Sequence, residues 1–126
     1  MKEIIKTDNA PQAIGPYSQA VKCGNLLFVS GQIAIDPSTG DMIEGSITDK
    51  FNRTMDNIKA ILEAAGMGLK DVVKVTVFFK DISDFATVNK AYANYFTSDY
   101  PAREAVEVAR LPKDADIEVS CIASRE

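Results

Sequence analysis

Histidine is absent from this chain of 126 residues, and cysteine occurs only twice. Without histidine, neither a Ser-His-Asp triad nor a Cys-His pair can form. Two cysteines also fall short of the roughly four ligands that a zinc site needs. The sequence contains no GxxxxGKS/T phosphate loop, and its glycines are spaced too widely for a dinucleotide-binding fingerprint. These absences exclude the commonest catalytic centres and leave arginine, carboxylates, tyrosines and small polar residues as candidates.

Long apolar runs and basic clusters are also missing. No stretch approaches the ~20 apolar residues of a membrane span, and the N-terminal MKEIIKTDNA lacks the apolar segment of a secretion signal. We therefore expect a cytoplasmic protein. The formal net charge is −4, and no Lys/Arg cluster is longer than two residues. This charge pattern argues against a nucleic-acid-binding surface.

The composition that remains is that of an ordinary globular protein, with 46% hydrophobic and 25% charged residues. The length predicts one domain that spans residues 1–126. Cys23 and Cys121 both lie in alternating apolar runs. We expect buried, reduced thiols there, because a domain of this size does not need a disulfide.

The first third of the chain alternates like β-strands. KEIIK is one short candidate, and YSQAVKCGNLLFVSGQI holds two more, which Gly24 and Asn25 join as a hairpin. DPSTGD, which follows shortly after, has the composition of a turn.

From Ser46 the apolar period changes to that of an amphipathic helix. Ser46 or Thr48 can cap its start, and Gly66 and Gly68 mark its end. The buried stripe of this predicted helix consists of Phe51, Met55, Ile58, Leu62 and Ala65.

A central strand, a second helix and two final strands are predicted after it. DVVKVTVFFKD is too apolar for an exposed edge strand. Ser83 then caps the second helix. The final strands lie around residues 105–108 and 117–123. The buried stripe of the second helix is predicted to hold Phe85, Val88, Tyr92 and Phe96, with Asn89 at its margin.

The predicted order of elements, β-β-β, α, β, α, β-β, indicates an α+β fold in which two helices pack on one face of a mixed sheet. One layer of helices leaves the other sheet face apolar and uncovered. A face of this kind needs a partner, so the pattern also predicts a homo-oligomer.

Arg103 and Glu118 lie on the two final strands, which we expect to pair. Arginine grips a substrate carboxylate through two hydrogen bonds. A carboxyl group in partly apolar surroundings has a raised pKa and can transfer protons near neutral pH. Together the two residues suit a small 2-oxo, 2-imino or 2-amino acid. An ordinary surface ion pair is the alternative that they leave open.

Two short segments near the N-terminus also have two interpretations each. IGPYSQA holds either a turn before a strand or a tyrosine, Tyr17, fixed at a pocket wall. In VSGQI, Ser30 and Gly31 either end a hairpin strand or offer a hydroxyl and an unobstructed backbone N–H to an anion.

Five blocks cover nearly the whole chain: NAPQAIGPYSQAV, VSGQI, NIKAILEAAG, VVKVTVFFKDISDFATVN and YPAREAVEVARLPKDADIEV. In the last and most specific block, Pro-Ala-Arg leads into a strand that continues to VEVARLPKDA. Together the blocks resemble the RidA (YjgF) family of reactive intermediate/imine deaminases.

This resemblance implies a chorismate-mutase-like fold that assembles as a homotrimer with ligand clefts between subunits. It implies a 2-iminobutanoate/2-iminopropanoate deaminase, a hydrolase of reactive enamine and imine acids such as 2-aminoacrylate. These acids arise when PLP-dependent dehydratases act on serine or threonine, and the products are a 2-oxo acid and ammonia. No metal or organic cofactor is implied.

Carried over by position, the resemblance implies that Arg103 binds the substrate carboxylate and that Glu118 orients a water. Gly31 would add its backbone N–H, with Ser30 beside it. Two further side chains would line the cleft, Tyr17 and Asn89.

The chain departs from the family pattern directly after Arg103. Many members have serine and then, one residue later, cysteine, whereas this chain has Glu104 and Ala105. A thiol role at position 105 is therefore excluded. Strand alternation points Glu104 away from Arg103, so we expect a small effect of this carboxylate on anion binding.

The family also includes ligand-binding regulators and proteins described as ribonucleases or translation inhibitors. Arg103 would hold a 2-oxo acid equally well without catalysis, so a non-catalytic regulator that binds 2-oxo acids stays open as the alternative. The acidic charge disfavours the nuclease. The partners we expect are a small imino or 2-oxo acid and further copies of this chain, with no membrane and no nucleic acid.

Overall fold

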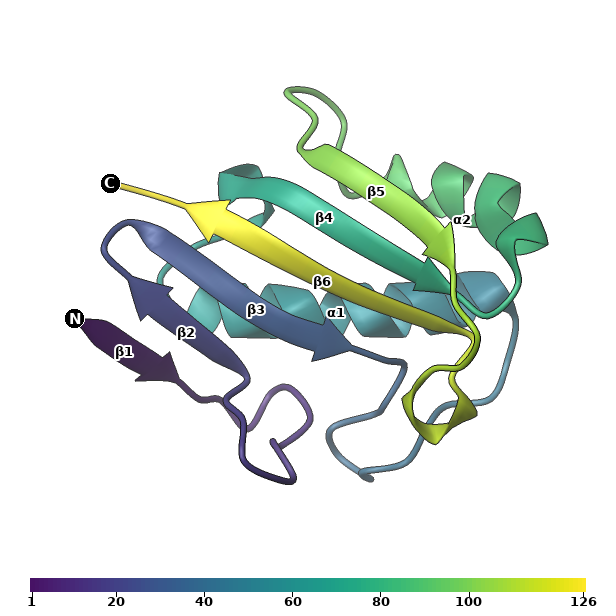
Figure 1. Ribbon diagram of the computed structural model, residues 1–126, viewed down its shortest axis with the longest axis horizontal. Helices are drawn as coiled ribbons and strands as arrows, with labels where there is room; N and C mark the ends of the chain where they lie inside the picture. The colour runs from purple at the N-terminus through teal and green to yellow at the C-terminus, as the bar shows by residue number, and fades with distance from the viewer.

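One six-stranded mixed sheet and two α-helices form the structure of residues 1–126, a computed structural model (Figure 1). The predicted α+β class and the order β-β-β, α, β, α, β-β are confirmed. The strands are β1 (Lys2–Ile5), β2 (Ala20–Cys23), β3 (Leu26–Gln32), β4 (Val72–Phe79), β5 (Ala102–Glu107) and β6 (Ile117–Ser124). The helices are α1 (Ile47–Ala64) and α2 (Phe85–Tyr92), with short 3-10 helices η1 (Leu69–Asp71), η2 (Ile82–Asp84) and η3 (Pro112–Asp114).

The strands lie in the order β1-β2-β3-β6-β4-β5, and only the β4–β5 pair is parallel. β4 has a neighbour on each side, which confirms the central strand predicted for DVVKVTVFFKD. The crossover through α2 places β5 on the outer edge of β4, and β6 pairs with its other edge. The expectation that the strands of Arg103 and Glu118 pair is therefore wrong, because β4 lies between them. β5 also begins at Ala102 rather than near residue 105, because its register with β4 starts there.

Both predicted turns of the first third are present. Cys23 and Leu26 are register partners across the β2–β3 turn, and Gly24 takes the positive φ of 60° that the turn requires. In DPSTGD, the backbone N–H of Gly40 donates to the carbonyl of Asp36. The hairpin and the turn thus follow from short-range backbone chemistry.

The first helix starts and ends where its sequence predicts. Of the two possible N-caps it is Ser46 that acts: its hydroxyl accepts from the N–H of Asp49, and the Asp49 carboxylate accepts from the N–H of Ser46. The chain leaves α1 through Gly66, whose φ is +74°. Four residues of the predicted stripe, Phe51, Met55, Ile58 and Leu62, are fully buried. The fifth, Ala65, follows the last helical residue and is only partly buried.

The start of the second helix differs from the prediction. Ser83 does not cap it; this residue lies inside η2, where its N–H and its hydroxyl both donate to the Asp81 carboxylate. Asp81 therefore caps the turn that leads into α2. Val88 and Tyr92 are buried as predicted, and so is Phe96, which lies beyond the last helical residue.

Both helices cover the same face of the sheet (Figure 1), and a core of 23 buried residues lies between the two layers. The other face, which we call the open face, keeps large apolar side chains in contact with solvent, as the sequence predicts. Ile4, Phe28 and Val106 are 54%, 45% and 43% exposed. The single chain therefore leaves an apolar surface without a cover.

The two cysteines are both free, but only one of them is buried. Cys121 lies inside the core, and burial raises the pKa of its thiol to about 12. Cys23 is exposed, contrary to the expectation, because it lies at the end of β2 next to the hairpin turn. Neither helix is both long enough and apolar enough to cross a membrane.

Candidate functional site

Arg103 lies on the edge strand β5 and projects to the side of the sheet that the helices cover. Its register partner on β4 is Val75, a core residue, so both side chains share that face. The Arg103 Nη1 donates to Oδ1 of Asn89 on α2 at 2.8 Å. The guanidinium carbon lies 4.6 Å from the centre of the Tyr92 ring and 5.3 Å from that of Phe85. The arginine is exposed, yet it is held by three residues of one helix.

Glu118 lies on β6 and projects to the open face, where Phe78 is its register partner on β4. It is half-buried, and burial raises the pKa of its carboxyl above the usual range. A carboxyl group with a raised pKa can hold or release a proton closer to neutral pH.

Gly31 lies directly against the Glu118 side chain. A Cβ atom at position 31 would lie 2.6 Å from the Glu118 Oε2 and 2.8 Å from its Cδ. A side chain at position 31 would therefore displace the Glu118 carboxylate. The two residues meet within one chain, at the β-bulge where the β3–β6 register shifts between Val29 and Gln32.

Ser30 lies in this bulge, and Tyr17 directly precedes Ser18, the residue that Ser30 contacts. The Ser30 hydroxyl donates to the carbonyl of Ser18 at 2.6 Å, so its oxygen is left as an acceptor. Tyr17 is 54% exposed, and its N–H donates to the carbonyl of Gly15, whose φ of +125° favours glycine. A tight turn thus directs the tyrosine ring outward.

The predicted site residues form two groups on opposite faces of the sheet. Arg103 stands beside Val75 on the helix-covered face, whereas Glu118 stands beside Phe78 on the open face. Positions 75 and 78 of one strand are three residues apart and point to opposite sides. The structure brings Arg103 to Asn89 and Glu118 to Gly31, and it does not bring Arg103 to Glu118. An ion pair between them within one chain is excluded.

Glu104 and Ala105 occupy the places where the family pattern differs. Glu104 pairs with Lys74 on the open face, with an N–O distance of 2.6 Å. This confirms that Glu104 points away from Arg103. Ala105 shares the face of Arg103 and packs against the core.

Phe85 and Tyr92 were predicted as core residues, not as neighbours of Arg103. Their role beside Arg103 could have been predicted from the sequence. Residues 85, 89 and 92 share one helix face, and Asn89 was already a candidate for the site.

Gln19 was missed altogether. Its buried side-chain amide donates to the carbonyls of Thr7, Ala10 and Pro11, and its oxygen accepts from the N–H of Thr7. Its own carbonyl accepts from the N–H of Ser30. Gln19 thereby ties the N-terminal loop to the bulge. The alternation of apolar and polar residues does not reveal the role of Gln19, because its hydrogen-bond partners are carbonyl groups of a separate loop.

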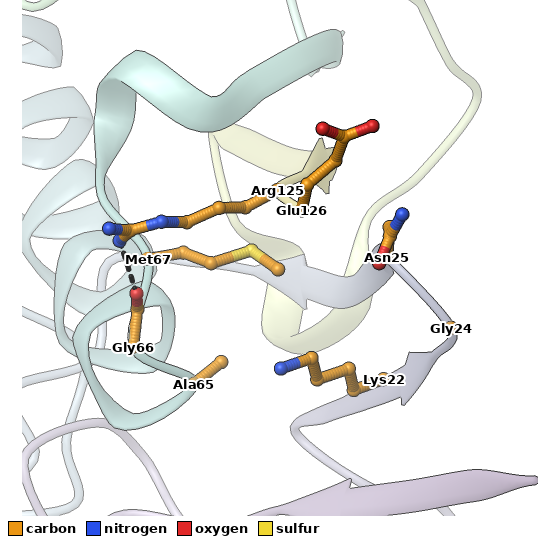
Figure 2. A pocket seen from close by; sticks show the side chains of 8 residues that line it. All are labelled: Lys22, Gly24, Asn25, Ala65, Gly66, Met67, Arg125 and Glu126. Atoms are coloured by element: carbon orange, nitrogen blue, oxygen red, sulfur yellow. Dashed lines mark hydrogen bonds between the residues drawn. The ribbon is translucent and has the colours of Figure 1, made fainter.

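A cavity of about 300 Å³ lies elsewhere, at the end of α1 (Figure 2). The Arg125 guanidinium donates to the carbonyl of Gly66 there at 2.7 Å, which satisfies a free carbonyl beyond the helix end. None of the predicted site residues lines this cavity. No group of three or more His, Cys, Asp or Glu side chains is placed to hold a metal ion.

Similarity to known proteins extends over the whole chain. Residues 7–125 match the model of the family described as Endoribonuclease L-PSP. A RutC family protein of Pyrococcus horikoshii is 60% identical over 126 residues, which cover both chains completely. An Escherichia coli K12 protein named 2-iminobutanoate/2-iminopropanoate deaminase is 51% identical over 128 residues, which cover 99% of each chain.

Solved structures share the fold closely. YyfA of Yersinia pestis, a member of the conserved Rid protein family, has a TM-score of 0.97 and 44% identity, with 99% of this chain and 100% of YyfA covered. E. coli TdcF with bound serine has a TM-score of 0.93 and 45% identity, with 98% of this chain and 99% of TdcF covered. The chain therefore belongs to the Endoribonuclease L-PSP family, the RidA (YjgF) family that its motifs indicate.

Proposed function

We propose that this protein is a 2-iminobutanoate/2-iminopropanoate deaminase that hydrolyses reactive imine and enamine acids to 2-oxo acids and ammonia. The observation that carries the proposal is the arrangement at Arg103, an exposed guanidinium with one edge held by Asn89 and one face held by aromatic rings. Such a group is prepared to bind a small carboxylate through its remaining N–H donors. The proposal assigns this activity to a single domain of residues 1–126.

Two relatives support this substrate class. The E. coli protein named as the deaminase is 51% identical to this chain. TdcF, 45% identical, has serine bound in its crystal structure, and serine carries the same 2-amino-acid carboxylate group. A carboxylate with nitrogen on the adjacent carbon is common to serine and to the proposed imines.

We infer that the working site lies between copies of the chain in a homotrimer. Within one copy, Arg103 and Glu118 lie on opposite faces of the sheet, so a site that uses both needs two copies. One copy would contribute Arg103 and Asn89, and the next copy would contribute the open-face group. The exposed apolar side chains of the open face support such a contact, because they are left without a cover. The open-face group consists of Glu118, Gly31 and Ser30, and we assign Tyr17 to it because the next residue, Ser18, accepts the hydrogen bond of the Ser30 hydroxyl.

The chemistry requires little more than positioning and proton transfer. Arg103 holds the carboxylate and thereby fixes the C=N carbon. Glu118 orients a water, whose oxygen adds to this carbon while a proton passes to the nitrogen. In the tetrahedral carbinolamine the hydroxyl proton then passes to the nitrogen, the C–N bond breaks with release of ammonia, and the C=O bond of the 2-oxo acid forms. An imine is electrophilic already, so this route needs neither histidine nor a cofactor.

Release of pyruvate from serine by a PLP-dependent dehydratase tests the proposal. Wild-type protein should accelerate the release, and Arg103→Ala should lower catalytic efficiency at least about a hundredfold, because two charge-assisted hydrogen bonds are lost. Arg110→Ala removes another exposed arginine and serves as the matched control.

The negative results separate the alternatives. Binding of 2-oxobutyrate without acceleration would make the protein a non-catalytic regulator. Salt-sensitive RNA binding without either would favour the nuclease function after which the family model is described.

A further inference from the structure

The contacts of Arg103 come from a single helix. Phe85, Asn89 and Tyr92 lie at the first, fifth and eighth positions of α2, a spacing that puts all three on one face. Asn89 takes one hydrogen bond from Nη1 at 2.8 Å. The two rings lie 4.6 and 5.3 Å from the guanidinium carbon, within the range of a cation–π contact. We call Phe85 and Tyr92 the aromatic shelf.

The shelf limits a side chain that would otherwise be highly mobile. An exposed arginine samples many rotamers, and a ligand must order it on binding. A ring over one face of the guanidinium restricts its tilt, and a hydrogen bond to one edge restricts its rotation. The N–H donors that remain then point in fixed directions before any ligand arrives.

The shelf itself is rigid, because both rings also belong to the packed core. The ring centre of Tyr92 lies 6.3 Å from that of Phe51 on α1, and Tyr92 is only 6% exposed. Phe85 makes an edge contact with Phe79 at 6.1 Å. Because the two rings are fixed in the core, they also restrict the motion of Arg103, an exposed side chain on an edge strand.

We infer that Phe85 and Tyr92 are positioning residues that hold the Arg103 guanidinium in the orientation that receives the substrate carboxylate. This inference rests on the proposed function. It assigns to the shelf an effect on ligand affinity rather than on the chemical step, because the rings touch the arginine and not the reacting atoms. A loss of the shelf should therefore raise KM and leave kcat nearly unchanged.

Three substitutions separate positioning from folding. Tyr92→Leu removes the ring and keeps an apolar side chain. Tyr92→Phe keeps the ring, and the hydroxyl that it removes is buried without a hydrogen-bond partner, so no bond is lost. Phe96→Leu is the matched control, because it replaces a buried ring that lies next to Tyr92, but does not contact Arg103, by another apolar side chain.

The test combines two measurements on the full-length protein. NMR relaxation gives the order parameter of the Arg103 Nε–H bond in the free protein, and titration gives the affinity for 2-oxobutyrate. In Tyr92→Leu we expect a lower order parameter and an affinity weaker by about two- to fivefold, the range of one exposed cation–π contact. KM should rise by the same factor with kcat within about twofold. Tyr92→Phe and Phe96→Leu should match the wild type in all of these.

An unchanged order parameter or an unchanged affinity in Tyr92→Leu would overturn the inference. So would equal losses in Tyr92→Leu and Phe96→Leu, since these would mark a general effect on the core. Wild-type protein that binds no 2-oxobutyrate would contradict the proposed function instead. The order parameter would then still decide whether the shelf fixes the guanidinium.

Discussion

The regions around Arg103 and Glu118 differ in how completely one chain organises them. Arg103 is exposed on an edge strand, yet one hydrogen bond and two aromatic rings hold it. Glu118 is half-buried on an inner strand, against Gly31, and burial is the only cause of its raised pKa. The side chains of one chain thus fix the orientation of Arg103, whereas they leave one side of Glu118 open to solvent.

This difference bears on the type of assembly. The two regions lie on opposite faces of the sheet, so a contact that joins them uses unlike surfaces of two copies. Contacts between unlike surfaces are head-to-tail and form a ring when the rotation between copies closes, whereas a twofold dimer joins each surface to itself. In the proposed homotrimer, each Arg103 would face the Glu118 of a neighbouring copy.

Among substitutions in the open-face group, Glu118→Gln should have the largest effect on turnover. The amide keeps the shape but cannot exchange a proton, so turnover should fall about a hundredfold. Affinity for 2-oxobutyrate should stay the same, because Arg103 provides that binding. Glu3→Gln, an exposed change on β1, is the control. Wild-type turnover in Glu118→Gln would remove this residue from proton transfer.

The same substitution should change how stability depends on pH. Burial raises the pKa of Glu118 in the folded protein, so the folded state binds more protons than the unfolded state between the ordinary and the raised value. The stabilisation is complete below the ordinary pKa of glutamate and is lost as pH rises through the raised value. Urea unfolding at several pH values should show this loss in the wild type and not in Glu118→Gln. If the free energy of unfolding changed with pH in the same way in both proteins, the raised pKa of Glu118 would be contradicted.

Gly31→Ala should have an intermediate effect. The new Cβ would lie 2.6 Å from the Glu118 Oε2, but the far end of this side chain can swing away. We therefore expect an unchanged melting temperature and a loss of about tenfold in kcat/KM as the carboxylate is displaced. Gly68→Ala, where a Cβ meets no atom within 4 Å, is the matched control. Equal activities would show that the position of Glu118 is not critical.

Glu104→Ala should have almost no effect. Its carboxylate pairs with Lys74 at the surface of the open face, and exposed pairs of this kind contribute ~0–1 kcal/mol. Catalytic efficiency should change by less than about twofold. A change beyond tenfold in steady-state kinetics would mean that Glu104 reaches the anion.

Thiol labelling tests which of the two cysteines is accessible to solvent in the folded protein. Cys121 is buried on the helix-covered face, with a pKa of about 12, and Cys23 is exposed. A thiol reagent should therefore modify one cysteine in the native protein and the second only after unfolding. Rapid modification of both would contradict the packing of the helices on this face.

Local features of the fold were predictable because they depend on neighbours in the sequence. The cap at Ser46 and the turn at Gly24 use bonds within a few residues. Ser83 was placed wrongly because Asp81, two residues earlier, competes for the same role at a 3-10 turn. The presence of a capping residue alone does not show whether a 3-10 helix or an α-helix begins there.

The site was only partly predictable, for a different reason. Alternation placed Glu104 and Arg103 on opposite sides of their strand, and the Lys74 pair confirms this. Alternation could not show that β4, from an earlier part of the chain, separates Arg103 from Glu118. Strand order is a long-range property, and here it decides that the two residues face apart.

Subunit mixing tests whether Arg103 of one copy works with Glu118 of the next. Arg103→Ala and Glu118→Gln proteins, each nearly inactive alone, are unfolded, mixed in equal amounts and refolded together. If each site takes one residue from each of two neighbouring copies, about a quarter of the sites regain both side chains, and about a quarter of wild-type turnover should return. Turnover no higher than that of the separate variants would contradict the account, since both residues would then have to come from one copy.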